Sequence, residues 1–136
     1  MRGVAGYSGT PLARKLGITP GATVLFDGAP TGFTPDGLPA DVLPHRRASR
    51  TDYDVIVCFC PDLARLRARW PVLHPRTTAA GALWIARPKK TAGLTTDLTE
   101  DAVRDYALTH GRVDVKVCAI DETWSGLKHV IRVADR

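Results

Sequence analysis

The sequence predicts a three-layer, Rossmann-like α/β domain with a mostly parallel sheet and a C-terminal antiparallel hairpin. Two observations carry this prediction. Strand and helix patterns alternate through the middle of the chain, which is typical of a parallel sheet with helices on its faces. The last two strand patterns are separated only by residues 121–126. A connection that short predicts an antiparallel hairpin, because a parallel crossover needs a dozen or more residues.

Length and composition are those of an ordinary soluble domain. The 136 residues, with 44% hydrophobic and 24% charged side chains, predict one domain over residues 1–136. No apolar run approaches the roughly 20 residues that span a bilayer. The N-terminus has no secretory h-region, so we expect a cytoplasmic protein, with residues 1–9 as a flexible segment.

The first third of the chain predicts one short helix, one short strand and a long loop. Thr10 and Pro11 suit the cap and first position of a helix that Gly17 ends. A strand follows at Ala22–Phe26. The Gly- and Pro-rich stretch after it predicts a loop, with one short strand near Asp41–Leu43.

The middle of the chain predicts two buried strands, Tyr53–Phe59 and Ala82–Ala86, because both runs are apolar and rich in β-branched or aromatic residues. Between them, Asp62 suits a helix cap. Pro71 is expected to shorten or kink this helix. Its inward face is predicted from apolar residues at helical spacing, namely Leu63, Leu66, Trp70 and Leu73.

The last third predicts a helix and two strands. Thr99 suits the N-cap, followed by acidic residues that favour a helix N-terminus, and Gly111 suits the end. Valines alternate with polar residues over Val113–Val117, the pattern of a half-buried strand. Leu127–Val133 is the second apolar run.

Three cysteines, an odd number, argue against a disulfide framework. We expect Cys58 and Cys60 to point to opposite faces of their strand, which disfavours chelation, and Cys118 to be a buried hydrophobe. With no His or Cys cluster, no metal site is predicted. Cys60, at a strand end, is the one thiol with a claim to reactivity.

The net charge of +5 is unevenly distributed along the chain. Residues 44–90 contain ten Lys or Arg and three Asp or Glu, whereas residues 91–136 contain six and eight. Such asymmetry can indicate an anionic partner. The alternative is a solvated helix face, which the spacing of Arg65, Arg67 and Arg69 favours.

The predicted topology brings several loops to the carboxyl edge of the sheet, where open α/β sheets bind ligands. Cations, carboxylates, hydroxyls and one indole would suit a small anionic or nucleotide-like ligand. The candidate binding residues are Lys89, Lys90, Thr96, Asp97, Asp121, Glu122, Trp124 and Ser125. Alternatively, the two lysines form ion pairs with Asp121 and Glu122 that tie two loops together, and Trp124 plugs the hairpin end.

Catalytic residues are not identifiable from the sequence. His45, His74, His110 and His129 have no Ser or Cys partner at an informative spacing, so a nucleophilic triad is unsupported. For His129, within a predicted strand, a structural role is favoured. Phosphate-loop and dinucleotide fingerprints are absent. These observations favour a non-catalytic protein.

Several strings resemble a class I S-adenosylmethionine-dependent methyltransferase. Leu16–Leu25 resembles the lead-in to the first strand of that family, Tyr53–Val57 its fourth strand and Gly81–Ile85 its fifth. The resemblance implies S-adenosylmethionine as cofactor, with Gly28 and Gly32 in the cofactor loop. The sequence departs from the family where Pro30 replaces the middle glycine, Phe26 takes an acidic position of the first strand and His45-Arg46 takes that of the ribose-binding acid. One βα unit of that family is also missing from this sequence, so the resemblance favours the fold over the activity.

Over nearly its whole length the chain is similar to a family of short, uncharacterised bacterial proteins. The resemblance rests on strings such as Gly6–Ala13, Trp84–Lys90, Thr96–Glu100 and Asp114–Lys128. It implies no activity.

Three functional hypotheses follow. The first is a non-catalytic binding or regulatory protein with an anionic ligand at the carboxyl edge. The second is a small S-adenosylmethionine-related transferase. The third is a nucleic-acid-binding protein that uses the basic stretches His45–Arg50, Arg65–Arg69 and Arg87–Lys90. Exposed edges on a small sheet also favour a homodimer.

Overall fold

The computed structural model describes residues 9–136, so the predicted flexible segment 1–9 lies outside the described residues except for Gly9. The strands are β1 (Val24–Asp27), β2 (Tyr53–Phe59), β3 (Thr77–Pro88), β4 (Val113–Ala119) and β5 (Trp124–Val130). The helices are α1 (Leu12–Lys15), α2 (Leu63–Leu73) and α3 (Glu100–Thr109). Single 3-10 turns form at η1 (His74–Arg76), η2 (Lys90–Ala92) and η3 (Val133–Asp135).

The five strands form one mixed sheet in the order β1-β2-β3-β5-β4. β1, β2 and β3 pair in parallel, while β5 pairs antiparallel with both β3 and β4. The predicted C-terminal hairpin is confirmed, but the prediction of a mostly parallel sheet is wrong. Because β5 inserts between β3 and β4, it has two antiparallel neighbours, so two of the four pairings are antiparallel.

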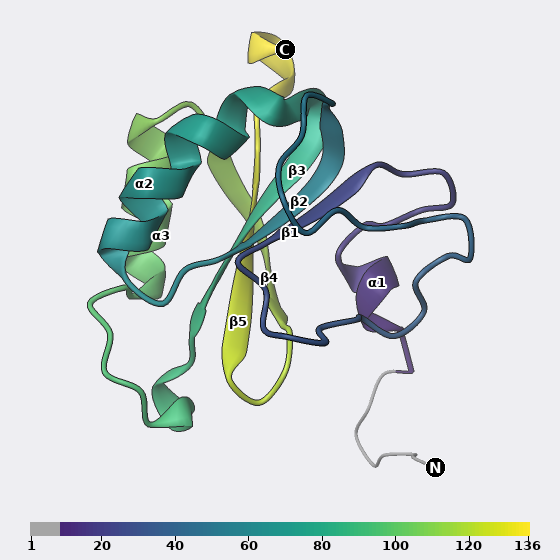
Figure 1. The fold of residues 1–136 in the computed structure, drawn as a ribbon. Helices are drawn as coiled ribbons and strands as arrows, with labels where there is room; N and C mark the ends of the chain where they lie inside the picture. Colours follow the sequence, from purple (N-terminus) through teal and green to yellow (C-terminus); the bar gives the residue numbers. More distant parts are fainter. Residues whose placement is uncertain (1–8) are drawn as a thin grey trace.

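Both faces of the sheet are covered (Figure 1). α2 and α3 lie on one face, whereas α1 and the long loops on either side of β1 lie on the other. The core on the helix side is formed by alternate strand residues and the inward helix residues, including Ile56, Leu83, Leu127, Leu66, Trp70 and Val103. The core on the opposite side includes Phe26, Val57, Trp84, Leu16, Ile18 and Val42.

Trp84 is the largest fully buried side chain. Its Nε1 donates a hydrogen bond of 3.1 Å to the carbonyl of Leu16, which ties the centre of β3 to the end of α1. Gly126 of β5 leaves the space that the indole occupies, because a Cβ there would lie 3.0 Å from Trp84 Cε3. This indole is thus one of the contacts that hold the short helix α1 to the sheet, beside the hydrogen bond from Lys116 Nζ to the carbonyl of Lys15 and the apolar packing of Ala13.

The predicted helix caps of α2 and α3 are present. Asp62 accepts a hydrogen bond from the amide of Arg65, and Thr99 accepts one from the amide of Ala102. Pro71 neither ends nor shortens α2, which continues to Leu73. At α1 the cap prediction is wrong, because the N-cap residue is Pro11 and has no side-chain cap hydrogen bond.

The short strand expected at Asp41–Leu43 does not form. The amide of Val42 instead closes a turn onto the carbonyl of Pro39. The chain reaches the sheet three residues later, where His45 forms an isolated bridge with Leu25. This bridge covers part of the outer edge of β1, while β4 has no second strand partner among residues 9–136 and is the open edge there.

The valines of β4 are more exposed than the predicted alternation implies. The pairing with β5 shifts between Asp114 and Lys116, so the alternation of side chains is interrupted at Val115. Val115 and Val117 are 54% and 50% exposed, and Cys118 is the buried residue of this strand.

Arg112 immediately precedes β4, near the C-terminal ends of α2 and α3. It is 1% exposed and has no carboxylate partner within residues 9–136. Its Nε donates to Nδ1 of His74 at 2.8 Å, and its amide donates to the carbonyl of Ala107. These partners lie at the ends of α2 and α3, where the helix dipoles favour a cation. Burial nevertheless lowers the pKa of Arg112 to about 10.

His129 is fully buried in β5, beside Trp70 of α2. Its Nδ1 contacts the carbonyl oxygen of Leu83 at 3.1 Å, which fits a donating Nδ1–H, and Nε2 has no hydrogen-bond partner. Burial lowers the pKa of His129 from 6.5 to about 4. The imidazole is therefore neutral at pH 7, as a structural role requires.

This burial predicts a loss of stability in mild acid. Between pH 6.5 and 4 the unfolded chain binds a proton at His129 that the folded chain does not, so the free energy of unfolding falls with falling pH. From pH 7.5 to 5 we expect a loss of about 2 kcal/mol from this residue. Urea denaturation at the two pH values measures it.

His129→Asn is the matched variant, since its amide can still donate to Leu83 and does not titrate. The loss should shrink but not vanish, because burial also lowers the pKa of His74. Asp114, whose pKa is lowered by the hydrogen bond from Arg104, loses its contribution only below its ordinary value of 3.8. An unchanged loss in the variant would contradict the assignment to His129.

Candidate ligand-binding site

The predicted site residues lie near the carboxyl edge of the sheet but do not share one pocket. Lys90 and Thr96 line a pocket beside α3. Gly28 and Gly32 line a second pocket at the end of β1. Asp121 lines a third, against the loop that follows β1.

The pocket beside α3, here called the α3 pocket, has a volume of about 590 Å³. β3 ends at Pro88, the η2 turn follows, and Gly93, with φ of 72°, reverses the chain toward the start of α3. The pocket lies between this excursion and the first turn of the helix. Its lining residues are Arg87, Pro88, Lys90, Leu94, Thr96, Leu98, Thr99, Glu100 and Asp101.

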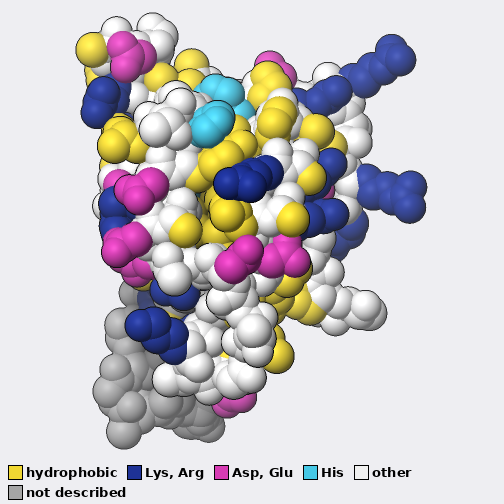
Figure 2. All heavy atoms as spheres, turned by 90° about the vertical axis from the view of Figure 1, so that its left-hand side faces the viewer, with side chains coloured by type: hydrophobic (Ala, Val, Ile, Leu, Met, Phe, Trp, Pro, Cys, Tyr) yellow, Lys and Arg dark blue, Asp and Glu magenta, His cyan; other side chains and the backbone are white. Residues whose placement is uncertain are grey.

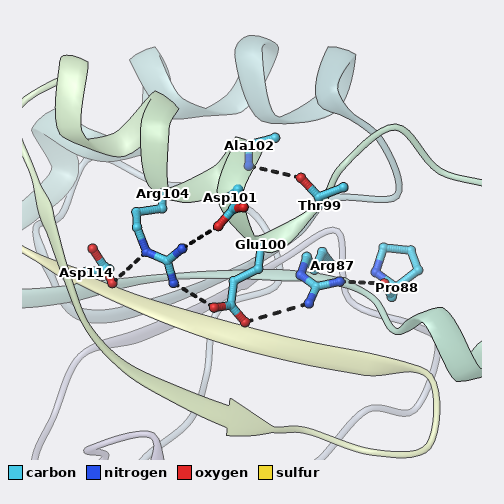
Figure 3. Close-up of polar contacts among 8 residues, drawn as sticks. All are labelled: Arg87, Pro88, Thr99, Glu100, Asp101, Ala102, Arg104 and Asp114. Carbon is cyan, nitrogen blue, oxygen red and sulfur yellow. Dashed lines mark hydrogen bonds and ion pairs between the residues drawn. The ribbon is translucent and has the colours of Figure 1, made fainter.

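Arg104 organises the acidic side of the α3 pocket (Figure 3). Its guanidinium contacts Glu100 at 2.6 Å, Asp101 at 2.7 Å and Asp114 at 3.0 Å. The hydrogen bond to Glu100 is the main cause that raises the pKa of Arg104. Glu100 and Asp101, the two acidic residues that line the pocket, thus both form ion pairs with Arg104, which does not line it.

Arg87 lies on the other side of Glu100, and its side chain is mostly buried. Its guanidinium donates a hydrogen bond of 3.2 Å to the carbonyl of Pro88. The distance from Arg87 to Glu100 Oε1 is 3.9 Å, longer than the 2.6 Å between Arg104 and Glu100 Oε2. Figure 3 shows Glu100 between the two arginines. The longer contact leaves the Glu100 Oε1 side of the carboxylate as the more loosely held one.

Lys89 and Lys90 do not form the ion pairs with Asp121 and Glu122 that were one alternative. The two loops are joined instead through the backbone, where the amide of Lys89 donates to the carbonyl of Thr123 at 2.7 Å. Within the part of the chain that the structure describes, neither lysine takes part in an ion pair.

Thr96 and Asp97 make contacts that fix the loop to α2. Thr96 Oγ1 donates to the carbonyl of Pro61 at 2.7 Å and accepts from the amide of Leu98. Asp97 accepts from the amide of Leu63, the first residue of α2. Both side chains therefore have structural roles.

The hairpin residues close the end of the sheet. Asp121 accepts hydrogen bonds from the amides of Thr123 and Trp124, both at 2.8 Å, which shapes the turn. The indole of Trp124 packs edge-on against Phe59 at 5.3 Å. This matches the alternative in which Trp124 plugs the hairpin end. Glu122 is exposed, and Ser125 pairs with Arg87 within the sheet.

The glycine loop after β1 encloses a pocket of about 330 Å³. Gly28 and Gly32 have positive φ angles, which favour glycine. A Cβ at Gly28 would lie 3.2 Å from Arg65 and 3.3 Å from the carbonyl oxygen of Phe59. Arg46 covers the ring of Phe26 at 5.2 Å. Packing within the fold is thus sufficient to require Gly28.

Asp27 was not among the predicted site residues, yet its buried carboxylate contacts two arginines and a thiol at this edge of the sheet. It is 5% exposed and accepts two hydrogen bonds from Arg69, at 3.0 and 2.9 Å, with Arg65 at 3.7 Å. The Cys58 thiol lies 3.5 Å from it. The hydrogen bond to Asp27 raises the pKa of Arg69. The signal in the sequence was an acidic residue ending an apolar strand, with two arginines one helical turn apart.

Cys58 and Cys60 point to the same side, with their Sγ atoms 3.5 Å apart, so the expectation of opposite faces is wrong. Residues two apart in a strand share a face. The hydrogen bond to Cys60, together with burial, raises the pKa of Cys58 well above its ordinary value, which disfavours a reactive thiolate. Among residues 9–136 no cluster of three or more His, Cys, Asp or Glu could hold a metal ion.

Comparisons with known proteins show no family. No family model and no curated protein matches the chain. One similar solved structure is described as "The structure of LepI complex with SAM", with a TM-score of 0.44 and 15% sequence identity. The match covers 89% of this chain and 39% of that chain. No helix within residues 9–136 is both long and apolar enough to cross a membrane.

Proposed function

We propose that this protein binds a small anionic or nucleotide-like ligand in the α3 pocket and acts as a binding or regulatory protein. One observation carries the proposal. The pocket brings Arg87 and Lys90 together with the hydroxyl group of Thr99 at the end of a central strand, and Lys90 has no ion-pair partner within residues 9–136. An unpaired cation in a concave site favours an anionic group.

The pocket also suits a ligand that donates hydrogen bonds. The loosely held carboxylate of Glu100 can accept from a hydroxyl or amino group while Lys90 neutralises the anionic end. Neither His nor Cys lines the pocket, and Arg104 holds its two carboxylates. This composition favours binding over general acid–base or nucleophilic chemistry.

A thermal-unfolding screen tests the proposal. Inorganic phosphate, AMP and ADP are the probes, and S-adenosylmethionine, its demethylated product and a DNA oligonucleotide represent the other two hypotheses. A probe at about 100 times its dissociation constant stabilises the fold by about 2.7 kcal/mol and raises Tm by several degrees. Lys90→Ala should weaken a bound anion by about tenfold, because it removes one charge–charge contact in a partly enclosed site.

Lys128→Ala is the matched control, since it removes the same charge from β5, outside the α3 pocket. Equal loss in both variants would indicate a general charge effect. If phosphate, AMP and ADP all leave Tm unchanged, the anionic-ligand proposal is wrong. Stabilisation by S-adenosylmethionine that Lys90→Ala leaves intact would favour the transferase hypothesis, and salt-sensitive DNA binding would favour the third.

A further inference from the structure

The outer face formed by α2 and α3 carries opposite charges on its two halves. α2 contains Arg65, Arg67 and Arg69 and no acidic residue, whereas α3 contains three acidic residues and one arginine. Figure 2 shows this face: hydrophobic side chains run along its middle, Asp and Glu lie on the left and below the centre, and Lys and Arg lie mainly on the right, with others at the centre and on the left. Because α2 is basic and α3 is mostly acidic, α2 of one copy is complementary in charge to α3 of a second copy.

One charge on each helix has no ion-pair partner among residues 9–136. The other two arginines of α2 contact Asp27, and Arg104 holds the two acidic residues at the start of α3. Arg67 and Asp105 are exposed and take part in none of the ion pairs. These two side chains are available for an external partner.

The two helices run side by side in the same direction, because each returns from the end of one of two parallel strands. Contacts at both ends fix their relative height. At the start, Asp97 accepts a hydrogen bond from the amide of Leu63. At the end, Trp70 Nε1 donates to the carbonyl of His110 at 3.3 Å.

Arg67 and Asp105 therefore lie at nearly the same level. Arg67 is four residues into its helix from Leu63 and Asp105 five from Glu100, which is about 6 and about 7.5 Å along the axes. Leu108, 55% exposed, follows Asp105 by three residues and lies on the same side of α3.

We propose that two copies of the chain associate through this face, about a two-fold axis that runs parallel to the helices and between them. Rotation about this axis places α2 of one copy on α3 of the other, at equal height. Arg67 of each copy then meets Asp105 of the other, so that the pair forms twice. An axis perpendicular to the helices would place α2 on α2, where like charges repel.

The size of the face sets the expected strength. The 11 residues of α2 span about 16 Å, and two helices are together about 20 Å wide. This face is smaller than the roughly 800 Å² per partner of a standard interface. The dimer should therefore be weak and sensitive to salt, because exposed ion pairs are screened.

Sedimentation velocity over a concentration series, at about 20 mM and about 500 mM NaCl, tests the proposal. Wild type should dimerise at low salt and dissociate at high salt. Arg67→Glu and Asp105→Arg should each weaken the homodimer at least about tenfold, because each variant places like charges together at both symmetric positions. Arg14→Glu makes the same charge change on α1, on the other side of the sheet, and should leave the dimer intact.

The decisive result is a mixture of the two helix variants. A heterodimer of Arg67→Glu with Asp105→Arg has an opposite-charge pair at both positions, so the mixture should associate as tightly as wild type while each variant alone does not. The proposal is overturned by a wild type that is monomeric at about 1 mM in low salt, or by a mixture no tighter than its components. It would equally be overturned if Arg14→Glu weakened the dimer as much as Arg67→Glu.

Discussion

Trp84→Ala is expected to lower the free energy of unfolding by about 3–5 kcal/mol, the range measured when a buried aromatic side chain is truncated. The indole is fully buried against both Leu16 and Gly126, and its removal also leaves the carbonyl of Leu16 without its donor. Guanidinium denaturation followed by far-UV circular dichroism measures the change. A loss of this size is a large fraction of the 5–15 kcal/mol that stabilises a typical domain.

Two further variants separate packing from hydrogen bonding. Trp84→Phe keeps an aromatic ring but removes the Nε1 donor, so it should cost about 1–3 kcal/mol. Trp124→Ala removes an indole that is only partly buried, and its cost should be clearly smaller than that of Trp84→Ala. If the two alanine variants are equally stable, Trp84 does not have the central packing role assigned to it.

Arg69→Leu is the second substitution with a large expected effect. It leaves the nearly buried carboxylate of Asp27 with only Arg65, at 3.7 Å, as a cation nearby. Breaking a buried ion pair on one side costs about 3–5 kcal/mol. Because Arg69 is itself a quarter exposed and Arg65 remains, we expect about 3 kcal/mol, at the lower end of that range. Equilibrium denaturation at pH 7 measures the loss.

A double-mutant cycle distinguishes the charge from the packing of the side chains. Asp27→Asn/Arg69→Leu removes the unpaired charge that the single variant leaves, so the double variant should be more stable than Arg69→Leu alone. Arg67→Leu, on the exposed side of the same helix, is the matched control and should change stability by less than about 0.5 kcal/mol. Additive losses in the cycle would show that the pair is not coupled.

The elements of the fold followed from local chemistry. Asp62 and Thr99 cap α2 and α3 as their position before an apolar periodic segment predicts. The apolar runs at Tyr53–Phe59 and Ala82–Ala86 lie within adjacent central strands. These signals involve residues close in sequence, so composition and spacing are enough to find them.

The pairing of the strands and the arrangement of the site residues could not be predicted from such local signals. The hairpin was predicted, but the insertion of β5 between β3 and β4 depends on which strand β5 pairs with on its other side, and no local signal records that choice. One alternative had the two lysines joining the loops through ion pairs with Asp121 and Glu122, whereas a hydrogen bond from the Lys89 amide to the Thr123 carbonyl joins them. Side-chain directions at strand ends depend on register, which pairing across the sheet decides.

The α/β class, the caps of α2 and α3 and the buried central strands around Trp84 were predictable from the residues alone, because each depends on burial or on hydrogen bonds within a few residues. Long-range packing set the mixed pairing of the sheet, the contact of Asp27 with Arg69, and the division of the candidate residues among separate pockets. Those features join positions more than 30 residues apart. The energy of such contacts depends on distances that a linear sequence does not contain.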